Sequence, residues 1–185
     1  MTNSELSLRL ARPLDAATIA ILSRDLIEYG LQWRWTPVRV AASIQAPDVN
    51  VLVACINTNI AGFAIMRYGE NDAHLDLLAV APSHRRAGIG RQLLEWLEEC
   101  ALVAGICRVI LEVRAENEGA RRFYERLGYR TLAHVPGYYQ GSEAALRMGR
   151  DLSRRPVDHG ISEIQYNLAG FGVLRVAIPR LSPDP

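Results

Sequence analysis

The sequence predicts an α/β (α+β) fold in which about four helices flank a mixed central sheet of about six or seven strands. Segments with the two-residue alternation of a strand are interleaved with segments that repeat apolar residues at helical spacing. Residues 49–56 and 60–68 flank the turn residues 57–59, which is the pattern of a β-hairpin. Residues 75–81 form a mostly apolar strand, which leads through a glycine-containing loop into an amphipathic helix.

The length of 185 residues fits one domain, or one domain with an appendage, and the hydrophobic fraction of 49% is sufficient for an ordinary core. The net charge is only +1, and all 21 basic residues are arginine. This balance predicts no nucleic-acid partner, because nonspecific binding to phosphates requires an excess of positive charge.

The chain starts without a basic segment followed by an apolar run, and no apolar stretch approaches the roughly 18 residues of a membrane-spanning helix. We therefore expect a soluble, cytoplasmic protein with no membrane partner. Its cysteines are Cys55, Cys100 and Cys107, which form neither a CxxC pair nor a metal-binding spacing with histidine. Reduced thiols and no bound metal are the corresponding expectations.

The first part of the chain predicts a strand over residues 6–11 and a helix over residues 13–30, opened by a proline and closed by a glycine. Trp33 and Trp35 follow in a connecting segment, and a short helix is expected after Pro37.

After residues 75–81 the pattern predicts two more helices and three more strands. These are a helix over 89–105, a strand over 108–113, a helix over 117–128, and closing strands over 129–135 and 144–148 joined by a loop over 136–141. The first of these helices has a polar face that is expected to meet solvent. That face carries Arg91, Gln92, Glu95, Glu98 and Glu99.

The alternating pattern is complete by residue 152, so we predict one domain over residues 1–152 and a C-terminal extension over residues 153–185. The extension is polar at first and then apolar, and residues 174–178 could add one strand. Such a strand would extend the sheet or pair with a second subunit, so a homodimer is one expectation.

Residues 82–90 are the most informative segment, because they place arginines and glycines between a buried strand and a helix. The first turn of a helix has unpaired backbone N–H groups and a partial positive charge. Gly88 and Gly90 keep side chains away from this backbone, and Arg85 and Arg86 add positive charge. The segment is therefore suited to hold a pyrophosphate.

The same loop excludes two common phosphate-binding motifs. It has no Gly-Lys-Ser/Thr and so is not a Walker loop, and its helix is not followed by the acidic residue of a dinucleotide-binding fingerprint. In isolation, the loop could also be a glycine-rich strand-to-helix turn with solvated arginines.

Two sequence blocks together resemble the GNAT superfamily of N-acetyltransferases. The block similar to its coenzyme A signature is Leu78-Ala79-Val80-x-Pro82-x-x-Arg85-Arg86-x-Gly88-Ile89-Gly90-x-x-Leu93-Leu94. The second block is Leu111-Glu112-Val113-Arg114-x-x-Asn117-x-x-Ala120-x-x-Phe123-Tyr124-x-x-x-Gly128-Tyr129. Because the two blocks occur in order and at the right separation, the resemblance extends over about residues 6–152.

The resemblance implies a sheet that splays between its fourth and fifth strands, here residues 75–81 and 108–113. It also implies that acetyl-CoA is the acetyl donor and that the pantetheine arm lies along the splayed strand. The residues that the resemblance assigns to the cofactor are Leu78, Ala79, Val80, Arg85, Arg86, Ala87, Gly88, Ile89, Gly90, Asn117 and Tyr124.

Acetyl transfer to an amine requires a base, since an α-amine with a pKa near ~8 must lose a proton. Glu112 is the first candidate, because a carboxylate on a mainly apolar strand needs a reason and the resemblance implies a glutamate base at this position. An ion pair with a nearby arginine is the alternative explanation. Asp76 is a rival base, and a water could relay the proton. The residues expected on the surface or in loops, with no catalytic role, are His74, His84, His134 and His159.

The thiolate that leaves must be stabilised or protonated, and Tyr124 is the candidate general acid. Helical spacing alone would make Tyr124 a core aromatic residue beside Phe123. The resemblance of the segment from Asn117 to Tyr124 favours a catalytic hydroxyl instead.

The closing region resembles the ribosomal-protein alanine acetyltransferase group, in which paired tyrosines lie near the first residues of the peptide. The matching residues are Gly137, Tyr138, Tyr139, Gly141, Glu143, Ala145 and Met148. We therefore expect direct attack by the α-amine of a peptide or protein. The residues expected to contact this acceptor are Trp33, Trp35, Asp76, Tyr138 and Tyr139. The alternatives are a small-molecule amine or amino acid as acceptor, and a non-catalytic acyl-CoA-binding sensor.

Overall fold

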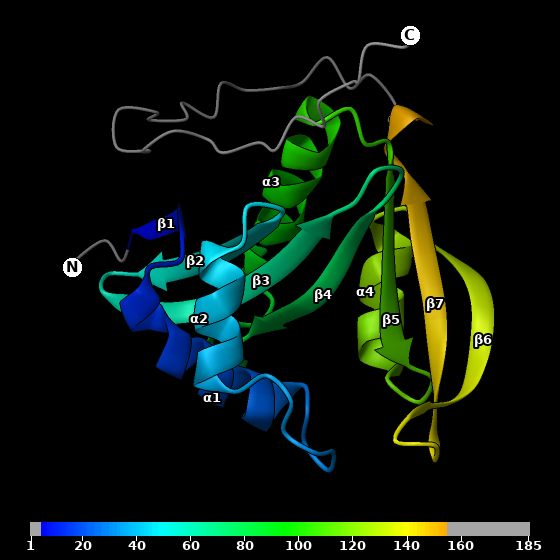
Figure 1. Ribbon diagram of the computed structural model, residues 1–185, viewed down its shortest axis with the longest axis horizontal. Helices are drawn as coiled ribbons and strands as arrows, with labels where there is room; N and C mark the ends of the chain where they lie inside the picture. The colour runs from blue at the N-terminus through cyan, green and yellow to red at the C-terminus, as the bar shows by residue number, and fades with distance from the viewer. Residues whose placement is uncertain (1–4, 155–185) are drawn as a thin grey trace, which may run out of the picture.

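The computed structural model of the chain describes residues 5–154. Its strands are β1 (Leu6–Leu10), β2 (Val49–Ile56), β3 (Asn59–Tyr68), β4 (Ala73–Val80), β5 (Arg108–Arg114), β6 (Arg130–Tyr139) and β7 (Glu143–Asp151). Its helices are α1 (Ala16–Leu26), α2 (Pro37–Gln45), α3 (Ile89–Val103) and α4 (Glu118–Arg126) (Figure 1). None of these helices is long and apolar enough to cross a membrane. The strand predicted over residues 174–178 lies outside the described residues.

The strands form one seven-stranded sheet in the order β1-β2-β3-β4-β5-β7-β6. Neighbouring strands are antiparallel except β4 and β5, which run parallel and pair only between positions 73–75 and positions 109–111. Beyond these positions the two strands separate, as Figure 1 shows, and we call this point the fork. The predicted mixed sheet, splayed between its fourth and fifth strands, is confirmed.

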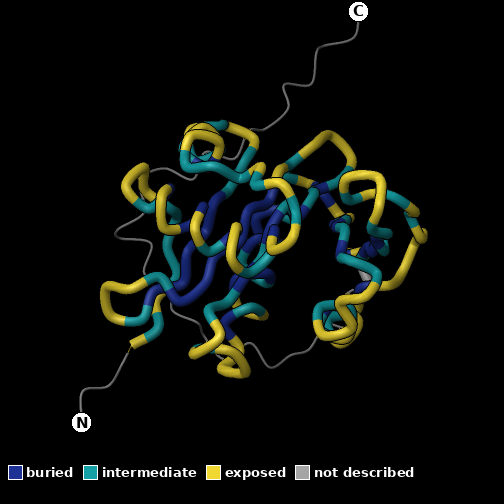
Figure 2. The backbone as a smooth tube through the Cα atoms, turned by 90° about the horizontal axis from the view of Figure 1, so that it is seen from below, coloured by how far each residue is buried: buried dark blue, intermediate teal, exposed yellow. Residues whose placement is uncertain are grey.

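The sheet is covered on both faces and therefore has two hydrophobic cores. Helices α3 and α4 pack on one face, where Leu93 and Leu97 are fully buried. Helices α1 and α2 pack on the other face, where Ile19 and Val40 are fully buried. Figure 2 shows the buried strands in the middle of the molecule and the exposed segments around them. Alternate residues of β5 join the first core, which leaves Glu112 on the face of α1 and α2.

A β-bulge in β4 reverses which side chains meet each core. The register between β3 and β4 skips Asp76, which is therefore an extra residue on β4. Before the bulge, Leu75 packs in the core under α3, whereas after it Leu77 packs in the core under α1 and α2. His74 and Asp76 consequently both lie on the side of α1 and α2.

The first helix is shorter than predicted. Residues Pro13–Asp15 form a 3₁₀ turn, and α1 ends at Leu26, whereas the prediction ran over residues 13–30. The carboxylate of Asp15 accepts a hydrogen bond from the backbone N–H of Arg12 at 2.6 Å. This contact tightens the entry to α1 into a 3₁₀ turn.

The loop predicted over residues 136–141 is also too long. Strand β6 continues to Tyr139, and β7 begins at Glu143. The pairing of β6 with β7 is irregular around Pro136 and Gly137, because proline has no N–H for the ladder and this glycine adopts a φ of 64°. Turn-forming residues here interrupt the ladder without ending the strand.

Glu98 does not face solvent as predicted. Its side chain is fully buried, accepts a hydrogen bond from the hydroxyl of Tyr129 at 2.9 Å, and pairs with Arg150 at 2.9 Å. Glu98 lies four residues after Leu94 and three before Ala101, and both of these residues are fully buried. Helical spacing therefore turns Glu98 inward, and a cation from β7 satisfies its charge.

Candidate active site

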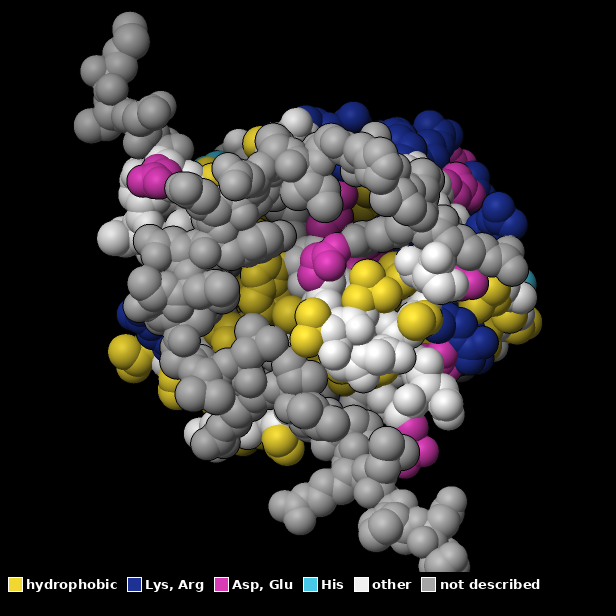
Figure 3. All heavy atoms as spheres, turned by 90° about the horizontal axis from the view of Figure 1, so that it is seen from above, with side chains coloured by type: hydrophobic (Ala, Val, Ile, Leu, Met, Phe, Trp, Pro, Cys, Tyr) yellow, Lys and Arg dark blue, Asp and Glu magenta, His cyan; other side chains and the backbone are white. Residues whose placement is uncertain are grey.

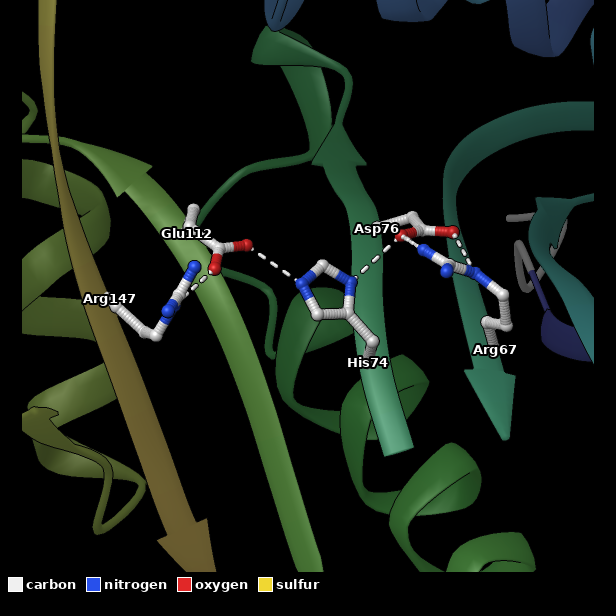
Figure 4. A network of polar contacts seen from close by, with 5 residues as sticks. All are labelled: Arg67, His74, Asp76, Glu112 and Arg147. Atoms are coloured by element: carbon white, nitrogen blue, oxygen red, sulfur yellow. Dashed lines mark hydrogen bonds and ion pairs between the residues drawn. The ribbon is translucent and has the colours of Figure 1, made fainter. Parts of the chain in front are cut away.

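A cluster of charged side chains lies at the fork on the face of α1 and α2 (Figure 4). Asp76 and Glu112 are the first residues past the paired stretch on β4 and β5, and His74 lies within that stretch. Arg67 from β3 and Arg147 from β7 complete the cluster. We call these five residues the ion-pair chain.

The ion-pair chain is continuous across the fork. One carboxylate oxygen of Glu112 accepts from Nε of Arg147 at 2.7 Å, and the other lies 2.7 Å from Nε2 of His74. Nδ1 of His74 lies 2.8 Å from Asp76, whose carboxylate also accepts from two N–H groups of Arg67. The side chains of Glu112 and Asp76 are 5% and 11% exposed, whereas the two arginines are about half exposed. The carboxylates are therefore shielded from solvent. The two ends of the ion-pair chain are the cations Arg67 and Arg147.

These contacts favour the charged form of every inner group. Hydrogen bonds from Asp76 and Glu112 raise the pKa of His74 to about 9. The hydrogen bond with His74, helped by Arg147, lowers the pKa of Glu112 despite its burial. Burial would raise the pKa of Asp76, but its hydrogen bonds with His74 and Arg67 outweigh burial and lower it. At neutral pH an imidazolium therefore lies between two carboxylates.

The sequence reasoning missed two residues of this cluster, His74 and Arg67. The expectation of a surface or loop histidine is wrong, because His74 lies on β4 with its side chain 26% exposed. Its partner Glu112 is 38 residues away in the sequence, so no local pattern could indicate the pair. The arginine partner considered for Glu112 exists and is Arg147.

The loop predicted to bind an anion, residues 85–90, joins β4 to α3. Arg86 and Gly88 have positive φ angles of 67° and 79°. Gly88 is the N-cap of α3, and no side chain among residues 5–154 caps the helix. The N–H groups of the first turn are therefore open to an external anion. A Cβ on Gly90 would lie 3.3 Å from the ring of Phe123, so this helix start also packs closely against α4.

The edge of β4 beyond the fork faces no strand on the β5 side. Part of the backbone of Leu78, Ala79 and Val80 therefore has no ladder partner within the described chain. An extended, amide-bearing ligand could pair with this edge as a further strand would. Arg85 donates to the carbonyl of Val80 at 3.2 Å, which holds this arginine against the end of the strand.

Tyr124 belongs to α4 and Asn117 is the N-cap of this helix, which lies on the same side of the sheet as the loop. The side-chain oxygen of Asn117 accepts from the N–H of Ala120 at 3.0 Å, as expected of an N-cap, and its NH₂ group has no partner within residues 5–154. Tyr124 is buried, with its ring edge-on to Phe123 and Tyr129 at centroid distances of 5.0 and 5.5 Å. Burial raises the pKa of Tyr124, and its hydroxyl has no hydrogen-bond partner within residues 5–154.

Trp33 and Trp35 lie in the loop between α1 and α2 and pack against the core under these helices. The loop is organised by Glu28, which is 7% exposed and accepts from the backbone N–H groups of Arg34 at 2.7 Å and Trp35 at 3.2 Å. Nε1 of Trp33 donates to the carbonyl of Trp35 at 3.0 Å. Sequence reasoning also missed Glu28, because a glutamate near a helix end is usually solvated.

Tyr138 and Tyr139 end β6 on the acceptor side of the fork. Their rings meet edge to face at a centroid distance of 4.9 Å. Burial and then the nearby charge of Glu112 raise the pKa of Tyr138, and burial raises the pKa of Tyr139 to about 12. The predicted tyrosine pair and the predicted base are thus neighbours.

Arg114 joins the α1–α2 loop to the β6–β7 hairpin. Its guanidinium donates to the carbonyls of Ile27 at 3.1 Å and Tyr29 at 2.6 Å, and it pairs with Glu143 at 3.1 Å. Arg114 follows Glu112 by two residues and so lies on the same face of β5. It therefore holds both segments close to the fork.

The candidate cofactor elements and the ion-pair chain lie on opposite sides of the sheet. The start of α3 and the whole of α4 belong to one face, and the α1–α2 loop belongs to the other. Two ligands that approach from these faces would meet at the fork, as direct transfer between them requires.

Known proteins are similar to about half of this sequence. The ribosomal protein bS18-alanine N-acetyltransferase of Escherichia coli is 37% identical over 100 residues, which cover 52% of this chain and 68% of that enzyme. An uncharacterized N-acetyltransferase of Methanocaldococcus jannaschii is 38% identical over 97 residues, 52% of this chain. The match spans 62% of the length of that second relative.

Solved structures share the fold. The crystal structure of Ard1 from Thermoplasma volcanium has a TM-score of 0.71 and 26% identity, and the match covers 80% of this chain and 97% of that one. The alanine N-acetyltransferase of E. coli has a TM-score of 0.69 and 27% identity, with 83% and 98% covered. Residues 18–129 match the acetyltransferase (GNAT) family, which confirms the resemblance seen in the two sequence blocks. This chain is therefore a member of the GNAT family of acetyltransferases.

Proposed function

We propose that the protein is an N-acetyltransferase that moves the acetyl group of acetyl-CoA to the α-amine of a peptide or protein. The observation that carries the proposal is the fork. It brings Glu112 and His74 to one side of an open strand edge and the uncapped start of α3 to the other. The relatives named as alanine N-acetyltransferases support an α-amine as the acceptor.

The residues around the fork fit the donor. Acetyl-CoA supplies an acetyl group that is already activated as a thioester. The N–H groups at the start of α3 would hold its pyrophosphate, with Arg86 adding charge and Gly88 leaving the backbone open. The free edge of β4 suits the amides of its pantetheine arm, and the NH₂ group of Asn117 offers one more donor.

The pair of His74 and Glu112 receives the proton that the attacking amine loses. When His74 is neutral, the pair takes up a proton with a pKa of about 9. This exceeds the ~8 of an α-amine, so transfer to the pair is favourable. Asp76 orients the ring through its other nitrogen, and Arg67 engages both oxygens of Asp76, which leaves that carboxylate poorly placed as a base.

Tyr124 acts as the general acid that protonates the leaving thiolate. Because burial raises the pKa of Tyr124, its hydroxyl stays protonated at the working pH and can donate to the departing sulfur. Its position on α4 is on the cofactor side of the sheet.

Release of free thiol from acetyl-CoA, measured with a panel of amines, tests the function. We expect turnover with peptides that have a free N-terminal alanine and none with the same peptides blocked at that amine. Because the chain contains no lysine, acetylation of its own lysine side chains cannot contribute to the signal. Calorimetry with coenzyme A separates binding from chemistry. Binding without turnover on any amine would support a sensor, and no binding would overturn the proposal.

A pH profile tests the role of His74. The pair is protonated below a pKa of about 9, so kcat should rise as the pH rises toward 9. In His74→Gln the pH at which kcat rises should shift down toward the pKa of the acceptor amine, and the maximum kcat should fall. The profile is measured with saturating donor and an acceptor whose amine pKa is known. If wild type and variant show the same profile, His74 is not part of the base.

Replacing Tyr124 with phenylalanine should lower kcat by about 10²-fold or more, with thermal stability and the affinity for coenzyme A almost unchanged. The reason is that the hydroxyl has no hydrogen-bond partner within residues 5–154 whose loss would weaken the fold. Tyr68→Phe is the matched control, because its hydroxyl contacts Asn50 and the carbonyl of Leu97 away from the fork. That variant should lose stability and keep kcat. An active Tyr124→Phe enzyme would reject the catalytic role.

A further inference from the structure

We propose that the acceptor is an acidic peptide, one with carboxylate side chains next to its reactive amino end, and that arginines around the fork bind these carboxylates. The inference rests on the proposed function and adds the substrate class to it. The arginines are Arg34, Arg39, Arg67 and Arg147, which we call the arginine rim.

Two members of the arginine rim are the ends of the ion-pair chain. The carboxylates of Asp76 and Glu112 are shielded, and each is already engaged by His74 and by an arginine. Arg67 and Arg147 are 52% and 45% exposed. When His74 is protonated, the ion-pair chain contains three cations and two anions, so its net charge is +1. The exposed guanidinium groups of Arg67 and Arg147 present this positive charge to solvent.

The other two members belong to the α1–α2 loop and the first turn of α2. The guanidinium of Arg39 lies 4.1 Å from the centroid of the Trp35 ring, and this stacking leaves its N–H edge open to a carboxylate. Arg34 is exposed in the same loop. Neither Arg34 nor Arg39 has an acidic side chain as a partner within residues 5–154.

The loop that carries Arg34 is tied to β5 on the face that carries Glu112. Glu28 holds the N–H of Arg34 at 2.7 Å, and Arg114 holds the carbonyl of Tyr29 at 2.6 Å. Glu28 is 7% exposed and is engaged by backbone N–H groups of this loop, so it is not at the surface to pair with a guanidinium. An arriving peptide therefore meets cations on an ordered loop.

This arrangement differs from the charged surface elsewhere. On α4 each of two arginines pairs with a glutamate one turn away, as in Arg122 with Glu118 at 2.7 Å. Figure 3 shows basic and acidic side chains interspersed on the side of the molecule that carries β5–β7. Arginines whose charge is compensated in this way attract no particular ligand. The acceptor side lacks this compensation at Arg34 and Arg39.

An acidic peptide would gain twice from the arginine rim. Complementary charge would draw it to the fork and repel basic peptides. A peptide carboxylate on Arg147 would also compete with Glu112 for that guanidinium. This competition would weaken the interaction that keeps Glu112 ionised and so make the pair with His74 a better proton acceptor.

Three matched peptides test the inference. Each has a free N-terminal alanine, followed by aspartates, by asparagines or by arginines. At low ionic strength we expect kcat/KM to be at least about tenfold higher for the aspartate peptide than for the asparagine peptide, and lowest for the arginine peptide. The preference should shrink as salt screens the rim. Free aspartate is a fourth acceptor, which separates a peptide from an amino acid as the source of the carboxylate.

Charge-removing variants locate the preference. The double variant Arg34→Gln/Arg39→Gln should reduce the ratio between the aspartate and asparagine peptides several-fold. Arg130→Gln is the matched control, because Arg130 is exposed on β6 and also has no acidic partner within residues 5–154. This control should keep the full ratio. Equal loss in both variants would contradict the assignment to the rim.

The outcomes separate this inference from the function on which it rests. If the aspartate and asparagine peptides react equally well, the inference is wrong and the N-acetyltransferase function stands. A preference for the arginine peptide, or for free aspartate over every peptide, also overturns it. If coenzyme A binds and no acceptor reacts, the proposed function itself fails.

Discussion

Replacing Glu112 with glutamine is expected to lower kcat by about 10²–10⁴-fold while the protein stays folded. Glutamine has the same shape and can still accept from Arg147, but it cannot take up a proton. It also removes the negative charge that helps to raise the pKa of His74. Steady-state kinetics with the alanine peptide measure the loss, and calorimetry with coenzyme A should show donor binding close to that of wild type.

Asp72→Asn is the matched control for this substitution. Asp72 precedes β4 and pairs with Arg108 at the start of β5, so it also links the two strands, but away from the side where they separate. Its loss should leave kcat within a small factor of wild type. If Glu112→Gln retains nearly full kcat, the carboxylate only holds Arg147 and His74 in place, and another group must accept the proton.

The largest loss of stability is expected from Glu98→Ala. This substitution leaves Arg150 without its buried partner and Tyr129 without its acceptor, which costs about 3–5 kcal/mol of unfolding free energy. Urea denaturation followed by circular dichroism measures the change. The exposed pair of Glu95 and Arg91 on the same helix gives the comparison, because Glu95→Ala should cost less than about 1 kcal/mol.

A second variant separates charge from packing at this site. In Glu98→Leu/Arg150→Leu both charges are removed, so most of the lost stability should return. If the double variant is as unstable as Glu98→Ala, the cost arises from the shape of the site and from Tyr129 rather than from an unpaired buried charge.

The order of strands and helices could be predicted from the sequence because each element has a clear period. The helical stripe that includes Leu93 and Leu97 and the alternation around Glu112 both matched the structure. The ends of elements were less predictable. The 3₁₀ turn before α1 depends on the hydrogen bond between Asp15 and the N–H of Arg12. The spacing of apolar residues gives no sign of such a contact.

The bulge at Asp76 could not be predicted, although it determines where the charged groups point. Residues 77–80 are all apolar, so the switch in side-chain facing leaves no trace in the hydrophobic pattern. The loop over residues 85–90 could be placed from the sequence because its residues are consecutive and lie between a strand and a helix. The acceptor side could not, because His74, Glu112 and Arg147 come from three strands and become neighbours only in the folded sheet.

The sparse pairing at the fork links proton transfer to how firmly the two halves of the sheet are held together. Strands β4 and β5 share only three register pairs, so the contact between His74 and Glu112 also acts as a tether between the two half-sheets. This contact is strongest when the imidazole is charged, and it weakens when that charge is lost. The form of the enzyme that is ready to take a proton is therefore also the form whose halves are least restrained. In each turnover the contact between His74 and Glu112 would strengthen when this pair gains a proton and weaken when the pair loses it.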